Sequence, residues 1–580
     1  MHTCILLLSS VTIARAWSIQ KPELQLPPDA AEKGRDAIDL FTAAYGDYKK
    51  YAWGHDSLAP LSKSFIDDRN GWGATIVDAM STMKIMGLED LFTEAVEFSS
   101  KIDFNRTKTP DNVSLFETTI RYLGGLVSAY ELGGKKDHAL IDRARDVGNK
   151  LSNGWQGTND FPYNNLNFTS DAPVIEESGI AVAGTLILEW AKLAEYTGNK
   201  TYLELAEKSM RRIGTNDSPL PGLPAQGIDP STGKPVGDYI TWGGGSDSYF
   251  EYLIKYGRLT NNASPEWTSR WLVAVDSSIR YLAQTAVGTS IPNLMYLGDY
   301  TGGTSRWLTA VDSSIRYLAQ TAVNTSVPDL LYLGDYTKNR VRHISSHLAC
   351  FHGGNWIMGG RLTGNDTIVQ YGLRLTDACW NSYEKTATGI GPEVFAYVGP
   401  DGNYTGVSPS ARDLEFYEKN GFYVYNNYAY YDLRPEVLES NFYAWRATGD
   451  IKYFNRAVSG LESIKKYCTP GVGVAGINDV RSTNSTYIDQ TESFFFAEVI
   501  KYIYLTFDDP NKFNLDKYVF NTEAHPLEAP DPIQSFRPPQ RAQIGGHLPS
   551  KSWTGQIPEI SYAPGVQKKL SDVIEQGIDL

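Results

Sequence analysis

Residues Glu177–Ile213 read ESGIAVAGTLILEWAKLAEYTGNKTYLELAEKSMRRI, and this stretch decides the fold. A helical pattern runs to Tyr196, Thr197-Gly198-Asn199 interrupts it, and a second helical pattern follows from Lys200. A glycine just past a helix commonly ends it, because glycine adopts left-handed backbone angles without a steric penalty. The stretch therefore predicts two helices joined by a short turn.

The same pattern of a helix, a glycine-containing turn and a second helix recurs along the chain. Val437–Ala447 leads into Thr448-Gly449-Asp450 and a second helix, and His343–Leu362 leads into Thr363-Gly364-Asn365 and another. Helical patterns dominate from about residue 33 to 508, and strand-like patches are confined to loops. Repeated helical hairpins with long returns predict a closed or stacked α/α array. A single large helical toroid is therefore favoured over two domains.

Composition narrows the class of protein. The 580 residues are 42% hydrophobic and 21% charged, which is ordinary for a globular protein with a large core. A formal net charge of -14 and the lack of a Lys/Arg cluster disfavour a nucleic-acid partner. Aromatic residues reach 12%, which suits a carbohydrate site but equally suits a large core.

The first residues resemble a secretory signal. The apolar run 4–13 precedes Ala14-Arg15-Ala16, a small-x-small cleavage pattern, and it is too short to span a bilayer. No later segment predicts a transmembrane anchor. With residues 1–16 as a signal peptide, we expect a glycosylated protein that is secreted or lies in the lumen of the secretory pathway. Asn-x-Ser/Thr sequons occur at Asn105, Asn112, Asn167, Asn199, Asn216, Asn262, Asn324, Asn365, Asn403 and Asn484.

Three cysteines remain if Cys4 leaves with the signal peptide. One disulfide and one free thiol is the simplest outcome in an oxidising compartment, and we favour Cys350 with Cys379, leaving Cys468 buried and unpaired. No CxxC spacing occurs, so zinc is not expected.

A tandem duplication interrupts the pattern. Residues 269–304 and 305–340 match at 28 of 36 positions. Each copy predicts a helix, ending near Ala286 or Ala322, and an extended piece, Leu294–Tyr296 or Leu330–Tyr332. A closed toroid has no vacancy for an extra unit, so we expect one copy to lie outside the regular packing; an error in the gene sequence would explain the repeat equally well.

Acidic residues recur in apolar helical contexts, where carboxylates are seldom buried unless paired or functional. Asp247/Glu251 and Glu436/Glu439 each place two acids on one helix face. For any single acid a solvated or salt-bridged face is an equally good explanation, but so many together are hard to explain that way. The set comprises Asp78, Glu117, Glu189, Asp247, Glu251, Glu436, Glu439 and Glu498.

Glycoside hydrolysis needs a protonated carboxyl group at the leaving oxygen and a carboxylate that activates water or attacks carbon. An acid-lined toroid supplies both. The sequence contains no GxSxG, HExxH, phosphate-binding or dinucleotide-binding motif. After the last helical pattern, Val519–Leu527 predicts a short extended segment that presents Thr522, Glu523 and His525.

These segments, together with His347–Phe351 and Gly391–Phe395, resemble glycoside hydrolase family 47, the class I α-1,2-mannosidases. The resemblance covers about Ala31–Leu527, and Gly245 and Leu188-Glu189-Trp190 look most like the secreted filamentous-fungal branch. It implies one catalytic domain at 31–527, an (α/α)7 toroid of helical hairpins whose short C-terminal β-hairpin plugs one end. It also implies bound Ca2+ and inversion at the anomeric carbon. Residues 528–580 are expected to form an irregular tail.

The resemblance also implies roles for individual residues. Glu117 would be the general acid, Glu436 the general base and Asp247 a further catalytic carboxylate, and family opinion places the acid at either Glu117 or Asp247. Asp78 is a further pocket acid, and the family disulfide matches Cys350 with Cys379. Substrate contacts would come from Arg121, His347, Glu393, Arg434 and Phe494. Thr522 would bind Ca2+ directly, with waters held by Glu189, Glu251, Glu439, Glu498 and Glu523 completing an oxygen-only shell.

The expected function is calcium-dependent hydrolysis of terminal α-1,2-linked mannose from high-mannose oligosaccharides or N-glycoproteins, by a monomer. Glycine at 245 replaces an arginine that restricts branch choice in endoplasmic-reticulum members, so we expect broader trimming. One alternative is a mannose-binding, lectin-like member of the same fold with little or no turnover, although all three catalytic carboxylates are present. Another is an inverting hydrolase of a different sugar on a six-hairpin toroid.

Overall fold

The computed structural model describes residues 18–281, 319–321, 331–333, 335–337, 340–398, 405–533 and 536. The predicted signal peptide and nearly all of the tail lie outside these residues. Of the tail, Glu528 belongs to a strand, and residues 529–533 are irregular. Arg258 donates to Pro530 O at 2.8 Å, so this first part of the tail packs against the barrel.

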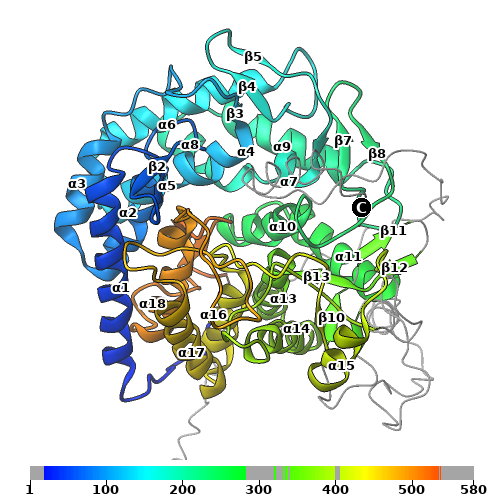
Figure 1. The fold of residues 1–580 in the computed structure, drawn as a ribbon. Helices are drawn as coiled ribbons and strands as arrows, with labels where there is room; N and C mark the ends of the chain where they lie inside the picture. Colours follow the sequence, from blue (N-terminus) through cyan, green and yellow to red (C-terminus); the bar gives the residue numbers. More distant parts are fainter. Residues whose placement is uncertain are drawn as a thin grey trace, which may run out of the picture.

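Seven helical pairs form a closed ring in the described part of the chain (Figure 1). Each inner helix contacts the next, and the last returns to the first, which confirms the (α/α)7 prediction. The inner helices are α2 (Ala74–Met86), α5 (Gly124–Leu132), α8 (Ile187–Thr197), α10 (Asp247–Leu259), α13 (His352–Thr363), α16 (Glu436–Thr448) and α18 (Ile500–Phe507). Their outer partners are α3 (Glu89–Ser99), α6 (His138–Leu151), α9 (Thr201–Ile213), α11 (Glu266–Tyr281), α14 (Asp366–Glu384), α17 (Ile451–Tyr467) and α1 (Ala30–Tyr51).

Burial explains which helices are inner and which are outer. Nearly every residue of α2 is buried, whereas α9 buries a single stripe that includes Tyr202, Ala206 and Met210. A helix that is apolar all round must be enclosed, and an amphipathic one can face water. The glycine stops occur as predicted, because Gly198, Gly364 and Gly449 end their helices with φ angles of 72°, 66° and 65°.

Short elements connect the pairs. The helical ones are α4 (Leu115–Thr118), η1 (Thr119–Leu123), η2 (Ser152–Gly154), α7 (Ile180–Gly184), η3 (Leu348–Phe351), α15 (Ala411–Asn420) and η4 (Phe495–Val499). The strands of the loop sheets are β1 (Ser57–Ala59), β2 (Ser64–Ile66), β3 (Val113–Ser114), β4 (Asn165–Asn167), β5 (Ala172–Pro173), β6 (Ser178–Gly179), β7 (Gly227–Asp229), β8 (Lys234–Val236), β13 (Ile344–Ser346), β14 (Val394–Ala396) and β15 (Tyr423–Val424).

Two stretches predicted as single helices are interrupted. Between Glu177 and Tyr196 the chain forms β6, then α7, and starts α8 only at Ile187. Long-range contacts cause the break, since Ala181 N donates to Gly245 O at 3.0 Å and Thr185 Oγ1 bonds Ser248 Oγ at 2.8 Å. The stretch from His343 likewise forms β13 and η3 before α13, because β13 pairs with β14.

The duplicated region is only partly described. The first copy contributes residues 269–281 to α11. In the second copy, the prediction of a helix ending near Ala322 is wrong at Ala319–Thr321, which form β9 and pair antiparallel with β10 (Leu331–Leu333). The extended piece predicted at Leu330–Tyr332 matches β10 to within one residue. A hairpin of β11 (Asp335–Thr337) and β12 (Arg340–Arg342) follows. The prediction that one copy lies outside the regular packing concerns residues that are mostly outside the described ones.

The C-terminal hairpin enters the ring. Its strands β16 (Tyr518–Phe520) and β17 (Pro526–Glu528) pair antiparallel and contact α10 and α5. Asn521 organises the turn: its Oδ1 accepts from the amides of Glu523 (3.0 Å) and His525 (2.7 Å). Its Nδ2 donates to Glu189 Oε1 at 2.7 Å. The turn is therefore tied to an inner helix and presents Thr522 and Glu523 inside the barrel.

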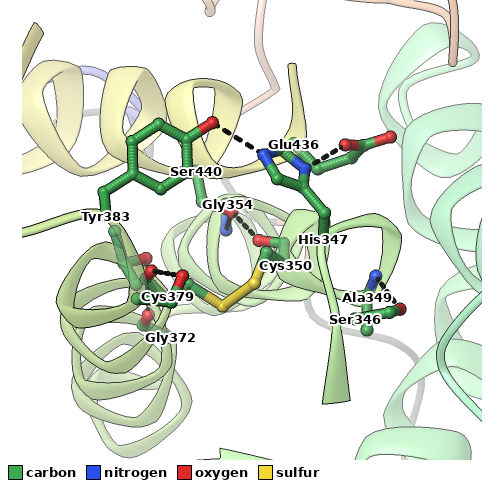
Figure 2. Close-up of a disulfide and its surroundings, with 12 residues drawn as sticks. Ser346, His347, Ala349, Cys350, Gly354, Gly372, Cys379, Tyr383, Glu436 and Ser440 are labelled. Atoms are coloured by element: carbon green, nitrogen blue, oxygen red, sulfur yellow. Dashed lines mark hydrogen bonds and ion pairs between the residues drawn. A yellow bond between two sulfur atoms is a disulfide. The ribbon is translucent and has the colours of Figure 1, made fainter. Parts of the chain in front are cut away.

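The predicted disulfide is present between Cys350 and Cys379, and Cys468 is free and buried. The bond links η3 to α14 beside the first residues of α13 (Figure 2). Among the helices that the structure describes, none combines the length and the apolar character needed to cross a bilayer.

Candidate active site

The three predicted catalytic carboxylates stand at or near helix N-termini. Glu436 is the first residue of α16, Asp247 the first of α10, and Glu117 the third of α4. Ser114 Oγ caps α4 by accepting from Glu117 N at 3.2 Å. Unpaired amides and the helix dipole favour negative charge at such positions. The ring of inner helices thus directs several carboxylates toward one region.

Glu436 is held in its ionised form. His347 Nδ1 lies 2.7 Å from Glu436 Oε2, and the Tyr383 hydroxyl lies 2.7 Å from His347 Nε2, so the imidazole bridges the two side chains (Figure 2). Burial opposes ionisation of Glu436, but His347 and the positive charge of Arg434 outweigh it and lower the pKa. A carboxylate that stays ionised near neutral pH can accept a proton from water.

Asp247 has the opposite tendency. Burial raises the pKa of its carboxyl group to about 7, and the charges of Glu251 and Glu436 add to that effect. The amide of Ser248 donates to Asp247 Oδ1 at 2.8 Å, which offsets only part of the rise. Asp247 is therefore a group that can hold a proton at neutral pH while Glu436 does not. Pairs of carboxyl groups with diverging pKa values are typical of acid/base sites.

Glu117 lies between two arginines. Its Oε2 accepts from Arg121 Nε at 2.8 Å and lies 3.6 Å from Arg69 Nε. Burial alone would raise the pKa of Glu117, but Arg121 and Arg69 lower it overall. Glu117 is therefore ionised in the free protein.

Arg121 connects the hairpin turn to the catalytic acids. It forms an ion pair with Glu523, lies 3.5 Å from Asp78, and donates to Ser493 Oγ at 3.2 Å. Arg121 is only 5% exposed and lies over the ring of Phe494 at 5.6 Å. Because its guanidinium is shared among several acids, Arg121 is a fixed cation that helps to hold the cluster together.

Most of the predicted metal-shell acids have raised pKa values, so burial among other acids favours their protonated forms when no cation is bound. Burial raises the pKa of Glu189 to about 8, although Tyr252 and Asn521 donate to its Oε1 at 2.5 and 2.7 Å. Burial, Glu251 and Glu436 raise the pKa of Glu439 to about 8. Burial also raises the pKa values of Glu498 and Glu523 well above the usual range. Glu251 forms an ion pair with Lys255, whose Nζ lies 3.8 Å from Glu439 Oε1.

Thr522 lies next to this carboxylate cluster. Its amide is 3.2 Å from the Tyr252 hydroxyl, which also bonds Glu189. Thr522 is half-buried, whereas its neighbours Asn521 and Glu523 are buried. The prediction that the hairpin carries Thr522 to the ring of acids agrees with these contacts.

Two predicted substrate contacts, Arg434 and Glu393, lie close to Glu436, whose pKa Arg434 helps to lower. Arg434 Nε donates to both carboxylate oxygens of Glu393, at 2.8 and 2.7 Å. Its buried Nη2 has no hydrogen-bond partner within the described structure. The structure thus brings together all the predicted catalytic, substrate and metal-shell residues, and their individual roles remain predictions.

Several site residues could not be found from the sequence. Arg69 and Tyr252 reach the site acids from separate segments, and nothing in the sequence distinguishes Asn521 from an ordinary turn residue. Burial, Asp432 and Asp68 raise the pKa of Glu492 to about 8, which adds one more acid beside Arg69. Glu492 directly precedes Ser493 and Phe494, so its place in that motif was the one available signal.

A closed helical barrel that gathers carboxyl groups, one ionised and one able to keep its proton, contains the two groups that a glycoside hydrolase requires. The chain belongs to glycosyl hydrolase family 47, whose model matches residues 40–307 and 303–529. The two matched segments meet inside the duplicated region.

Several similar proteins come from filamentous fungi. A probable mannosyl-oligosaccharide α-1,2-mannosidase 1B of Aspergillus clavatus is 36% identical over 551 residues, which cover 89% of this chain and 98% of that protein. The mannosyl-oligosaccharide α-1,2-mannosidase 1B of Aspergillus phoenicis is 34% identical and covers 91% of this chain and 99% of its own length. The solved α-1,2-mannosidase from Trichoderma reesei is 31% identical, with a TM-score of 0.77, and covers 86% of this chain and 99% of its own.

Proposed function

We propose that this protein removes terminal α-1,2-linked mannose from high-mannose N-glycans by calcium-dependent hydrolysis with inversion. The observation that carries the proposal is the opposed pair of carboxyl groups, Glu436 ionised and Asp247 able to keep a proton, inside a family whose relatives bear the α-1,2-mannosidase name. Inversion requires one carboxylate to activate water while another carboxyl group protonates the leaving oxygen.

Glu436 is the proposed base. Its Oε2 takes a proton from the attacking water, and His347 and Arg434 keep it ionised beforehand. Because His347 is itself fixed by Tyr383, the carboxylate is also held in one orientation. If the water that Glu436 activates attacks the face of the sugar opposite the leaving group, the anomeric configuration inverts.

Two groups compete for the role of acid. The family resemblance gives Glu117, whereas the charges in the site favour Asp247, since Glu117 is held ionised by Arg121 and Arg69. We propose that Asp247 holds the catalytic proton in the free enzyme. Glu117 then positions Arg121, which joins the acids to the hairpin turn.

The carboxylate cluster fits a bound Ca2+. Buried acids with raised pKa values lack enough cations, and Glu189 Oε2 has no hydrogen-bond partner within the described residues. The described residues contain no group of three His, Cys, Asp or Glu that could hold an ion directly. We propose Thr522 as a direct ligand because its amide lies 3.2 Å from the Tyr252 hydroxyl, which also bonds Glu189. Glu189, Glu251, Glu439, Glu498 and Glu523 would then act through water. When bound, Ca2+ would bind sugar hydroxyls and favour distortion of the ring.

Recognition of the sugar follows from the remaining side chains. We propose that Phe494 stacks on the apolar face of mannose and that Arg434, fixed by Glu393, donates to a hydroxyl. Gly245 has a φ of +88°, and a Cβ there would lie 2.6 Å from Gln226 Nε2, so a side chain is disfavoured at this position. The proposal of broad trimming rests on the family resemblance, in which a glycine at this position replaces an arginine that restricts branch choice. Secretion, or residence in the secretory lumen, likewise remains a proposal.

A panel of mannobioses tests the proposed specificity. The full chain should release mannose from the α-1,2-linked disaccharide at least about 100-fold faster than from α-1,3- or α-1,6-linked ones, a difference of about 2.7 kcal/mol in transition-state binding. Mannose release is measured by chromatography. Equal rates on the three linkages would contradict the specificity, and binding without release would favour the lectin-like alternative.

The pH profile tests the identity of the acid. Activity requires Glu436 ionised and Asp247 protonated, so kcat/KM on α-1,2-mannobiose should fall about tenfold per unit above pH 7. Fluoride leaves without protonation, so this decline should be absent with α-mannosyl fluoride. Asp247→Asn should retain cleavage of the fluoride and lose that of mannobiose. If Glu117→Gln shows that behaviour instead, Glu117 is the acid.

A further inference from the structure

The described sequons differ in the accessibility of the asparagine amide. Asn105, Asn112, Asn167, Asn199 and Asn484 are exposed. By contrast, Asn365 is 7% exposed, its Oδ1 caps α14 by accepting from Ile368 N, and its Nδ2 is buried. Asn216 Nδ2 is also buried without a partner in the described structure. A glycan at either buried site would prevent the observed packing, so only exposed sequons are compatible with glycosylation in this fold.

One exposed sequon lies beside a cleft that the proposed reaction does not use. The cleft has a volume of about 740 Å³, lies against the outer helix α3, and is lined by Trp53 and Phe98 together with charged side chains. The rings of Trp53 and Phe98 are 5.5 Å apart, and both residues are half-buried. The volume is within the range of small-molecule sites, about 300–1,000 Å³. Half-buried aromatic rings with polar groups at their edges suit the apolar face and the hydroxyls of a sugar.

The chain around Asn105 forms the rim of this cleft. Asp103, Arg106, Thr107 and Lys108 all line it, and Asn105 stands between them. Asn105 Nδ2 donates to Asp103 Oδ1 at 2.9 Å, so the nitrogen that would carry a glycan is next to a lining carboxylate. None of the other exposed sequon asparagines lies within the segments that line the cleft.

We propose that Asn105 is glycosylated and that the first sugars of its glycan occupy this cleft, with an N-acetylglucosamine packed on Trp53. In the modification, Asn105 Nδ2 loses a proton and bonds to C1 of a lipid-diphosphate-linked oligosaccharide, and the lipid diphosphate leaves. The mixed charges of the rim supply hydrogen bonds to an uncharged sugar core. The glycan would then act as an extension of the fold that covers the end of α3.

Protection from an endoglycosidase tests the proposal on the full chain, expressed in a eukaryotic secretory host. The enzyme should cut between the first two sugars, and release is measured at each asparagine by peptide mass spectrometry. On the native protein, release at Asn105 should be at least about tenfold slower than at Asn484, which is exposed and remote in sequence from the cleft. After denaturation the two rates should be equal.

A matched pair of variants distinguishes protection by the cleft from protection by general crowding at the protein surface. Trp53→Leu removes the ring and should bring the rate at Asn105 to within about twofold of that at Asn484. Phe65→Leu, a change at an exposed ring that does not line the cleft, should leave the difference intact. The proposal is overturned if Asn105 is unmodified, or if the endoglycosidase releases the glycans at Asn105 and Asn484 at equal rates on the native protein. Neither result depends on whether Trp53→Leu folds. A folded Trp53→Leu protein with unchanged protection at Asn105 also overturns it. This assay does not measure mannose release, so its result is independent of whether the proposed mannosidase function is correct.

Discussion

Glu436→Gln is expected to lower kcat for mannose release from α-1,2-mannobiose by about 10²–10⁴-fold, the usual contribution of a general base. The amide of glutamine cannot accept the proton of the attacking water. Its oxygen can still pair with His347, so the fold and the KM should change little. The measurement is steady-state kinetics together with thermal unfolding.

The matched control for this substitution is Glu462→Gln. Glu462 lies on α17 with its side chain 68% exposed and forms a 3.9 Å ion pair with Lys33, an arrangement that contributes little to stability. This variant should keep wild-type kinetics. A Glu436→Gln protein with activity within about threefold of wild type would remove Glu436 from the role of base.

Removal of Ca2+ by a chelator is expected to abolish activity and to lower the Tm, with the larger drop at pH 8. The raised pKa values of Glu189 and Glu439, both about 8, mean that the metal-free fold binds protons that the unfolded chain releases above about pH 4.5. Stability of the metal-free protein therefore falls as pH rises from about 4.5 to 8. A cation bound in the cluster removes the cost of ionising these buried acids. At a free Ca2+ concentration 1,000 times its Kd, binding stabilises the folded protein by about 4 kcal/mol.

The measurement is a set of unfolding curves at pH 5 and pH 8, with chelator and with added Ca2+. Because the carboxyl groups must ionise to hold the ion, Ca2+ should also bind more tightly at pH 8 than at pH 6. Glu189→Gln should reduce the gain in Tm from Ca2+, and Glu415→Gln, a change at an exposed side chain on α15, should not. Identical Tm values with and without Ca2+ at pH 8, or full activity in chelator, would contradict the metal site.

Local signals made the framework predictable from the sequence. The glycine stops at Gly198 and Gly449 mark where helices end, because those positions need left-handed backbone angles that glycine adopts most readily. Glu436 and Asp247 could be placed at helix starts from Pro435 and the preceding glycine-rich loop. Acids in apolar helices had to face either water or a functional interior, and the closed ring places them in the interior.

Contacts between distant segments were not predictable in the same way. The break before α8 depends on Gly245 O and Ser248, which lie far along the chain. The pKa of Glu117 is lowered by Arg121, four residues along the chain, and further by Arg69, whose position relative to α4 follows from the ring and not from any local pattern. Asn521 looks like an ordinary turn residue until its amide is seen to reach Glu189. At Ala319–Thr321, strand pairing overrode a helical pattern.

The stereochemistry of the first product tests the central claim most directly. Hydrolysis of methyl α-1,2-mannobioside, whose blocked reducing end means that each turnover frees one reducing mannose, is followed by proton NMR within the first turnovers, before that mannose equilibrates between its anomers. A base-activated water at Glu436 and a separate carboxylic acid predict β-mannose as the first product. Initial release of α-mannose would mean that a carboxylate attacks the sugar directly, and it would contradict the arrangement of base and acid proposed for this site.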